Sequence, residues 1–230
     1  MDFSFKKYPE IERHFGEHWL NDPKSTGHPL FRIYHENQYL TDFNEYLRDV
    51  DPRKSTSDQL RNLQQFWDIY YEFEIAYFLR KLGLNPILHK KICRKIPDIF
   101  LEKEKTVIEI KHLNIPDKIE QSTMCFDPKL HVHDVPEAVN VTFINMERML
   151  NRIEKNFQDV YPNIVCFCPE VSAGDCSDLE NLIEKHKVSE KISALAIWRR
   201  KKLVCFLENP CGKKLELESS KLQRFFNPKA

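Results

Sequence analysis

Two carboxylates and an ammonium group stand among strand-forming residues in the stretch PDIFLEKEKTVIEIKHL, residues 97–113. They belong to Asp98, Glu109 and Lys111, whereas the surrounding apolar residues are mostly β-branched or aromatic, as in the centre of a sheet. Carboxylate oxygens are the ligands that a hard divalent cation prefers. Binding of such a cation is therefore the chemistry that these residue types could support.

A hairpin would bring the two carboxylates together. The polar run EKEK has its midpoint between Lys103 and Glu104, and Asp98 and Glu109 are equidistant from that midpoint. A turn centred there would set the two carboxylates opposite each other, with Cβ atoms about 5 Å apart. Lys111 would share their face, being two residues after Glu109. Opposed like charges are destabilising unless a cation lies between them, and a register shift of one residue would turn Asp98 to the other face.

A simpler interpretation of the E-x-K triplet stays open. Charged residues make up 30% of the chain, and such triplets are common on the solvent face of antiparallel strands. Glu109 and Lys111 would then form a surface ion pair of little energetic consequence. On that interpretation the protein is a structural α/β domain.

The Pro-Asp pair at 97–98, followed eleven residues after the aspartate by E-x-K, resembles the signature of the PD-(D/E)XK nuclease superfamily, which has the restriction-endonuclease-like fold. That superfamily also carries a glutamate on the helix before the first core strand. The segment FEIAYFLRKLGL offers Glu74 for this position, nine residues before Gly83. Glu72 competes for the same role, but residues two apart on a helix face different ways, and we interpret Glu72 as a solvated charge.

The resemblance implies a metal-dependent phosphodiesterase that acts on nucleic acid, with DNA expected over RNA. Asp98, Glu109 and the backbone carbonyl of Ile110 would hold Mg²⁺ or Mn²⁺, which activates water and neutralises phosphate charge. Lys111 would position the attacking water and stabilise charge at the phosphorus. Glu74 would reach in from its helix to orient a water or complete the outer shell of the metal.

A basic run precedes the first carboxylate, in HKKICRKIPD. Its cationic residues could neutralise phosphates that flank the cleaved bond. They could equally be a solvated strand edge, where lysines discourage sheet-to-sheet pairing. The candidate substrate-binding residues are Lys90, Lys91, Arg94 and Lys95.

A second metal motif is weaker. His131, His133 and Asp134, in KLHVHDVP, could bind zinc with Cys125 nearby, although H-x-H alone does not make a site. The long polar loop that contains them, residues 114–137, could instead cover the active site and select substrates.

The pattern of elements indicates an α/β or α+β mixed sheet with helices on its faces. Predicted helices are 9–20, 36–49, 57–82, 138–159 and 177–187, and predicted strands are 86–90, 98–103, 105–113, 163–171, 192–199 and 202–208. Between residues 57 and 171 this order matches the α-β-β-β-α-β core that the resemblance implies, over about half of the chain. The expected organisation is an N-terminal helical extension (1–56), a nuclease-like core (57–212) with the inserted loop, and a charged tail (213–230).

Composition limits the remaining classes. The 230 residues carry no net charge, so the whole chain has no strongly basic footprint. GxGxxG, GxxxxGK[ST] and GxSxG motifs are missing, as is an apolar run long enough for a membrane span or a secretory signal. Seven scattered cysteines without a CxxC pair are interpreted as reduced thiols of a cytoplasmic protein, with Cys166 and Cys168 buried on one face of a strand.

Several functional alternatives stay open. The leading hypothesis is a metal-dependent endonuclease serving in repair, restriction or defence. The alternative is a non-catalytic nucleic-acid-binding or protein-interaction module on the same fold. Apolar residues of the N-terminal helices and of the strand pair 192–208 would suit a homodimer, without membrane association.

Overall fold

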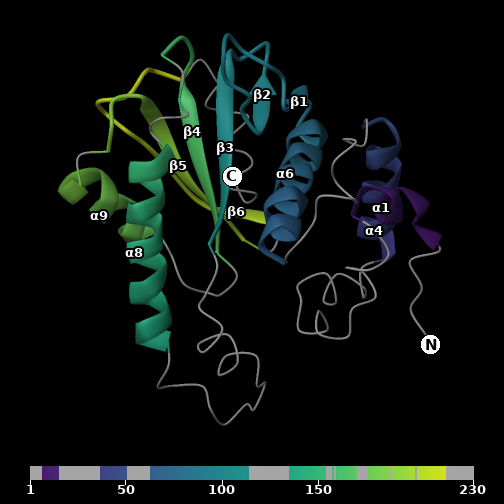
Figure 1. The fold of residues 1–230 in the computed structure, drawn as a ribbon, viewed down its shortest axis with the longest axis horizontal. Coiled ribbons are helices and arrows are strands. Elements are labelled where there is room, and N and C mark those ends of the chain that lie inside the picture. Colours follow the sequence, from purple (N-terminus) through teal and green to yellow (C-terminus); the bar gives the residue numbers. More distant parts are fainter. Residues whose placement is uncertain are drawn as a thin grey trace. The chain divides into compact units, whose positions relative to one another are not determined.

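Short runs of β-branched and aromatic residues form one six-stranded sheet (Figure 1). Its strands stand side by side in chain order, from β1 to β6. The pairs β3–β4 and β4–β5 are parallel, and the three other neighbouring pairs are antiparallel. The strands are β1 (Pro86–Leu88), β2 (Ile99–Leu101), β3 (Thr106–Leu113), β4 (Asn163–Pro169), β5 (Ile192–Arg199) and β6 (Lys202–Glu208). The sheet is thus mixed and open, and the α/β class expected from the sequence is confirmed.

The computed structural model describes residues 7–15, 37–50, 63–113, 135–153, 157, 159–169, 176–186, 188–199 and 201–215. Two compact units divide the chain, Met1–Tyr77 and Phe78–Ala230. The division falls within the long helix α6 (Leu63–Lys81), and each unit is described by itself. The boundaries expected at 56/57 and 212/213 stay predictions.

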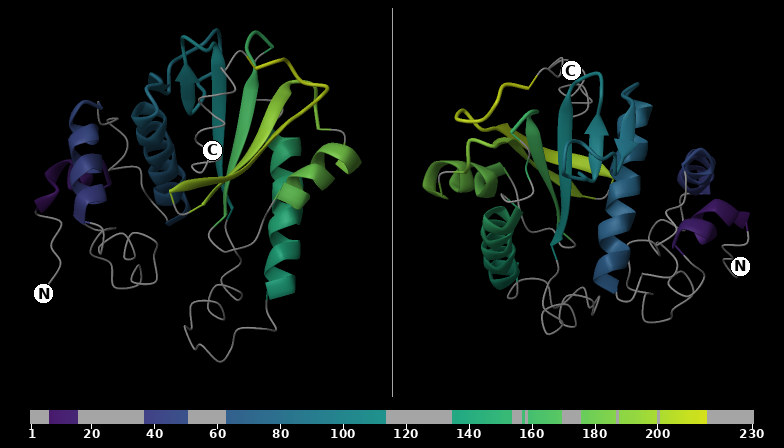
Figure 2. Two further views of the ribbon diagram at one scale, coloured as in Figure 1. Left: turned by 180° about the vertical axis from the view of Figure 1, so that it is seen from behind. Right: turned by 45° about the horizontal axis from the view of Figure 1, so that its top comes forward.

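Helices α8 (Val135–Ile153) and α9 (Cys176–His186) are the crossovers that parallel strands require. In both views of Figure 2 they lie on the same face of the sheet. Their apolar side chains form one core with alternate residues of β3 to β6. This core contains Leu113, Met146, Leu150, Ile153, Phe157, Val165, Phe167, Leu179, Leu182, Val188, Ile192, Leu195, Ile197 and Cys205.

The N-terminal unit contains α1 (Pro9–Phe15), α4 (Asn37–Arg48) and most of α6. The first N–H groups of a helix have no partner within it. In α1 the Asn44 Oδ1 of α4 accepts two of them, from Glu10 N at 2.9 Å and Ile11 N at 3.3 Å. Aromatic rings from all three helices pack together, including the T-shaped pair of Phe15 and Phe73. The expected N-terminal helices are therefore present.

The loop expected over 114–137 is shorter at its C-terminal end, because α8 begins at Val135. Residues 114–134 lie outside the described residues. The zinc candidates His131, His133 and Asp134, together with Cys125, therefore lie outside them too.

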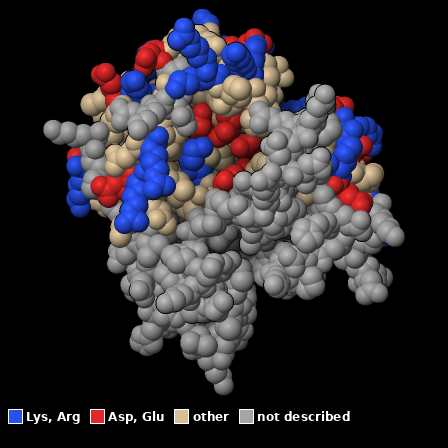
Figure 3. Space-filling model, viewed as in Figure 1, with Lys and Arg blue, Asp and Glu red and all other residues tan. Residues whose placement is uncertain are grey.

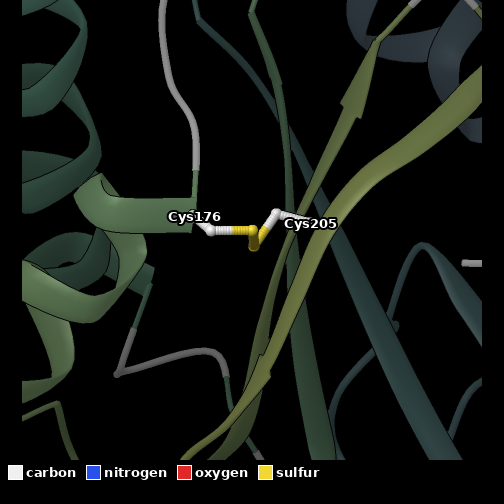
Figure 4. The surroundings of a disulfide bond; sticks show 2 residues. All are labelled: Cys176 and Cys205. Carbon is white, nitrogen blue, oxygen red and sulfur yellow. A yellow bond between two sulfur atoms is a disulfide. The ribbon is translucent and has the colours of Figure 1, made fainter.

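The cysteines correct one expectation. Cys176 at the start of α9 and Cys205 in β6 form a disulfide, so the interpretation of every cysteine as a reduced thiol is wrong for this pair (Figure 4). Cys166 and Cys168 are buried thiols of β4, as expected. Among the described residues, no helix combines the length and apolar character needed to cross a membrane.

Candidate functional site

The β2–β3 hairpin has the register expected from the sequence. Its Cα partners are Ile99 with Ile108, Phe100 with Val107 and Leu101 with Thr106, and the same register continued by one pair sets Asp98 beside Glu109. The turn is therefore centred between Lys103 and Glu104.

One residue of that turn, Lys105, has a positive φ of 48°, which lets the chain reverse between β2 and β3. A shift of the register by one residue would turn every side chain of β2 to the other face. The turn thus determines which carboxylates face each other.

Asp98, Glu109 and Lys111 converge on one point. Lys111 Nζ lies 3.4 Å from Asp98 Oδ2 and 3.4 Å from Glu109 Oε2. The same ammonium donates to the backbone carbonyl of Ile110 at 2.8 Å. In this structure the lysine is thus the cation that contacts both carboxylates.

Asp98 is held where β2 and β3 separate. Its Oδ2 accepts the backbone N–H of Ile110 at 2.7 Å. In the continued register Ile110 would pair with Pro97, but the ladder between β2 and β3 has ended before this pair. The Asp98 carboxylate takes the place of the missing strand partner and accepts the N–H of Ile110. The carboxylate is therefore fixed by the backbone of the strand that carries the other two charged residues.

Glu109 and Lys111 stand between apolar residues on one face of β3. On one face of this strand, Val107 belongs to a small cluster with Ile92, Phe100 and Tyr161, and Leu113 belongs to the core under α8. Glu109 and Lys111 lie between these apolar neighbours on the same face. The apolar flanks remove water from the glutamate, of which only 5% is exposed.

Burial, followed by the neighbouring Asp98 carboxylate, raises the pKa of Glu109 from 4.5 to about 7, against an opposing effect of Lys111. The first cause is desolvation, which disfavours the charged form, and the second is repulsion between like charges. A hydrogen bond between the two carboxyl groups also favours the protonated form of Glu109. Below about pH 7 the pair therefore holds a proton, which a bound cation would have to replace.

His89 joins this row: the sequence reasoning placed it in the basic run HKKICRKIPD and missed its pairing with Asp98. The β1–β2 register pairs Leu88 with Ile99, and continued by one pair it sets His89 beside Asp98. The backbone N–H of His89 donates to the Asp98 carbonyl at 3.0 Å, and a His89 ring nitrogen lies within 4.8 Å of an Asp98 carboxylate oxygen. The equidistance argument that paired the carboxylates could have found His89, had it been applied to the preceding hairpin.

Glu74 lies in the N-terminal unit, on α6, and is buried. Its Oε1 accepts hydrogen bonds from the hydroxyl groups of Tyr70 at 2.7 Å and Tyr39 at 3.2 Å. Burial, followed by the Glu74 charge, raises the pKa of both tyrosines, so both remain protonated donors. These bonds tie α4 to α6, and a catalytic role for Glu74 stays a prediction.

The basic run divides into engaged and exposed side chains. Lys90 Nζ forms an ion pair with Glu102 and lies 5.4 Å from the centre of the Phe100 ring. Lys91 and Arg94 are exposed, and Lys95 is partly buried. Figure 3 shows Lys and Arg side chains gathered near the top of the view, above β2 and β3.

The donor set suits a divalent cation. Two carboxylates and one backbone carbonyl offer oxygen ligands, and His89 adds an imidazole nitrogen at the edge of the row. No protein family, curated protein or solved structure matches the chain significantly.

Proposed function

We propose that the protein is a metal-dependent nuclease of the PD-(D/E)XK type, with a restriction-endonuclease-like core. The observation that carries this proposal is the convergence of Asp98, Glu109 and Lys111, with Lys111 Nζ at 3.4 Å from both carboxylates. The order of elements supports it, because a helix, three strands, a second helix and a fourth strand follow one another from α6 to β4.

Asp98, Glu109 and the Ile110 carbonyl would hold Mg²⁺ or Mn²⁺, with His89 beside them. When bound, the cation supplies Lewis-acid polarisation of a phosphate oxygen and activation of water. Mn²⁺ accepts an imidazole nitrogen as a ligand more readily than Mg²⁺ does. The presence of His89 therefore supports Mn²⁺ as a metal that activates the protein.

Lys111 contributes a positive charge beside the two carboxylates. Its side chain is partly exposed, at 25%, and its ammonium lies closer to the Ile110 carbonyl than to either carboxylate. A cation that replaces it between the carboxylates would leave the ammonium beside the phosphate. There it would donate a hydrogen bond to the charge that develops on the phosphate oxygens.

The test is cleavage of single-stranded DNA, duplex DNA and RNA in Mg²⁺ or Mn²⁺. We expect cleavage by the wild-type chain and a loss of at least about 100-fold in Lys111→Ala and Asp98→Asn. Lys202→Ala, an exposed lysine of β6, is the matched control and should cleave as the wild type does. Equal cleavage by all four proteins would assign the activity to a contaminant and refute the proposal.

One observation favours the alternative, a non-catalytic nucleic-acid-binding or interaction module. Lys111 already contacts both carboxylates, and its single charge balances the pair when Glu109 is protonated, so the triad can exist without metal. Isothermal titration with Mn²⁺ separates the two functions. The nuclease proposal requires binding that Asp98→Asn removes, whereas an absence of binding together with an absence of cleavage would favour the module.

A further inference from the structure

A tight turn stands directly before the first carboxylate. Ile92 and Lys95 exchange two backbone hydrogen bonds, of 2.8 and 3.0 Å, with only Cys93 and Arg94 between them. Cys93 has a φ of 56°, which the first central residue of such a reversal requires. We call residues 91–96 the basic turn.

The basic turn is anchored at both ends. Ile92 is buried in the small cluster with Phe100, Val107 and Tyr161, and Pro97 is buried immediately after the turn. A residue before proline is restricted to extended conformations, so the backbone of Ile96 is preset. The exposed side chains of the turn therefore project from a fixed base.

Ile96 is the most exposed large apolar residue among those that the structure describes, at 59%. A single exposed isoleucine needs no explanation by itself. This one stands next to Lys95 and two residues from Arg94. The Arg94 side chain, also exposed, makes no hydrogen bond or ion pair with another described residue. The turn thus presents an apolar wedge flanked by positive charge.

The chain between the wedge and the candidate metal site is short. Ile96 precedes Asp98 by two residues, so their Cα atoms are at most about 7 Å apart. Phosphates of one DNA strand are spaced by about 3.4 Å along the helix axis. A nucleic acid whose phosphate reaches Asp98 would therefore meet Ile96 within about two base steps.

We propose that the basic turn contacts duplex DNA beside the cleaved bond, with Ile96 inserted between base steps from the groove and Arg94 and Lys91 on the flanking phosphates. Apolar wedges of this kind unstack a base step and are flanked by cations on the backbone. Single strands are instead bound by stacking on aromatic rings, and the sequence KICRKI of the turn contains none. The inference rests on the proposed function, because it assumes that the cleaved bond lies at Asp98.

The test is equilibrium binding to a short DNA duplex that contains 2-aminopurine, in EDTA so that no cleavage occurs. Wild-type binding should increase the 2-aminopurine fluorescence, because the base is unstacked. Ile96→Ala should weaken binding about tenfold at every salt concentration and abolish the fluorescence increase. Arg94→Ala should reduce the slope of log affinity against log salt by about 0.9.

Matched controls come from β6, at the opposite end of the sheet from β1 and β2. Val204→Ala removes another exposed β-branched side chain, and Lys202→Ala removes another exposed cation. Both should bind and unstack the duplex as the wild type does. Circular dichroism of all four variants should be unchanged, because each replaced side chain is exposed.

Two results would overturn the inference. One is a duplex affinity of Ile96→Ala within twofold of that of the wild type. The other is binding of anionic lipid vesicles that depends on Ile96, in a protein whose duplex binding does not. If the protein cleaves DNA and Ile96→Ala binds the duplex as the wild type does, the contact is refuted and the nuclease proposal stands. Duplex binding that depends on Ile96, in a protein that neither cleaves nor binds metal, would support the contact and refute the nuclease proposal.

Discussion

The buried carboxyl of Glu109 should lower the stability of the metal-free protein at alkaline pH. Its pKa is raised from 4.5 to about 7, first by burial and then by Asp98. Folding therefore favours the protonated form. The stabilisation associated with this proton is complete below pH 4.5 and is lost as the pH rises through about 7.

Glutamine is neutral and nearly isosteric with the protonated side chain. Since one pKa unit corresponds to about 1.4 kcal/mol, linkage makes Glu109→Gln more stable than wild type by about 1 kcal/mol at pH 5 and about 3 kcal/mol at pH 8. In a chain of this length the alkaline difference should raise the melting temperature by about 5–10 °C.

The assay is urea and thermal unfolding of both proteins in EDTA at the two pH values. Glu208→Gln, which removes an exposed carboxylate of β6, is the control and should show no such pH dependence. Added Mn²⁺ should reverse the order at pH 8, because a ligand that binds only the native wild type stabilises it. A Glu109→Gln variant that is less stable than wild type at pH 8 in EDTA would refute the reasoning.

Three further changes test the packing of the sheet. A Cβ at Gly212 would overlap the carbonyl oxygen of Ile192, so Gly212→Ala should lower the free energy of unfolding by about 1–3 kcal/mol. Urea unfolding measures this, and an unchanged midpoint would contradict the close approach of the two backbones. The amide nitrogen of the buried Asn209 donates to three backbone carbonyls, one of them that of Ile192 at 2.8 Å. Asn209→Ala should therefore lower the free energy of unfolding in urea by about 2 kcal/mol. The disulfide of Cys176 and Cys205 spans 29 residues, and its reduction should lower stability by about 3 kcal/mol; melting curves that coincide with and without reductant would count against it.

The hairpin could be predicted because its signals are local. A polar turn between two apolar runs, together with the two-residue period of strands, sets the register of β2 and β3. The same local patterns gave β5 and β6 their bounds, 192–199 and 202–208, without error.

Other features escaped prediction because they join distant segments. Nothing near Cys176 indicates Cys205, and their pairing depends on α9 packing against β6. The four cations of the basic run look alike in sequence, yet Lys90 is engaged by Glu102 across the β1–β2 hairpin while Arg94 is exposed.

By itself the sequence determined which charged residues share a face of the β2–β3 hairpin, because side-chain alternation and turn position are properties of neighbouring residues. Only the tertiary structure decided the state of those charges. The apolar clusters around Val107 and Leu113 bury Glu109 and raise its pKa, and the β1–β2 pairing brings His89 to Asp98. Desolvation and proximity depend on how distant segments pack, which no local pattern contains.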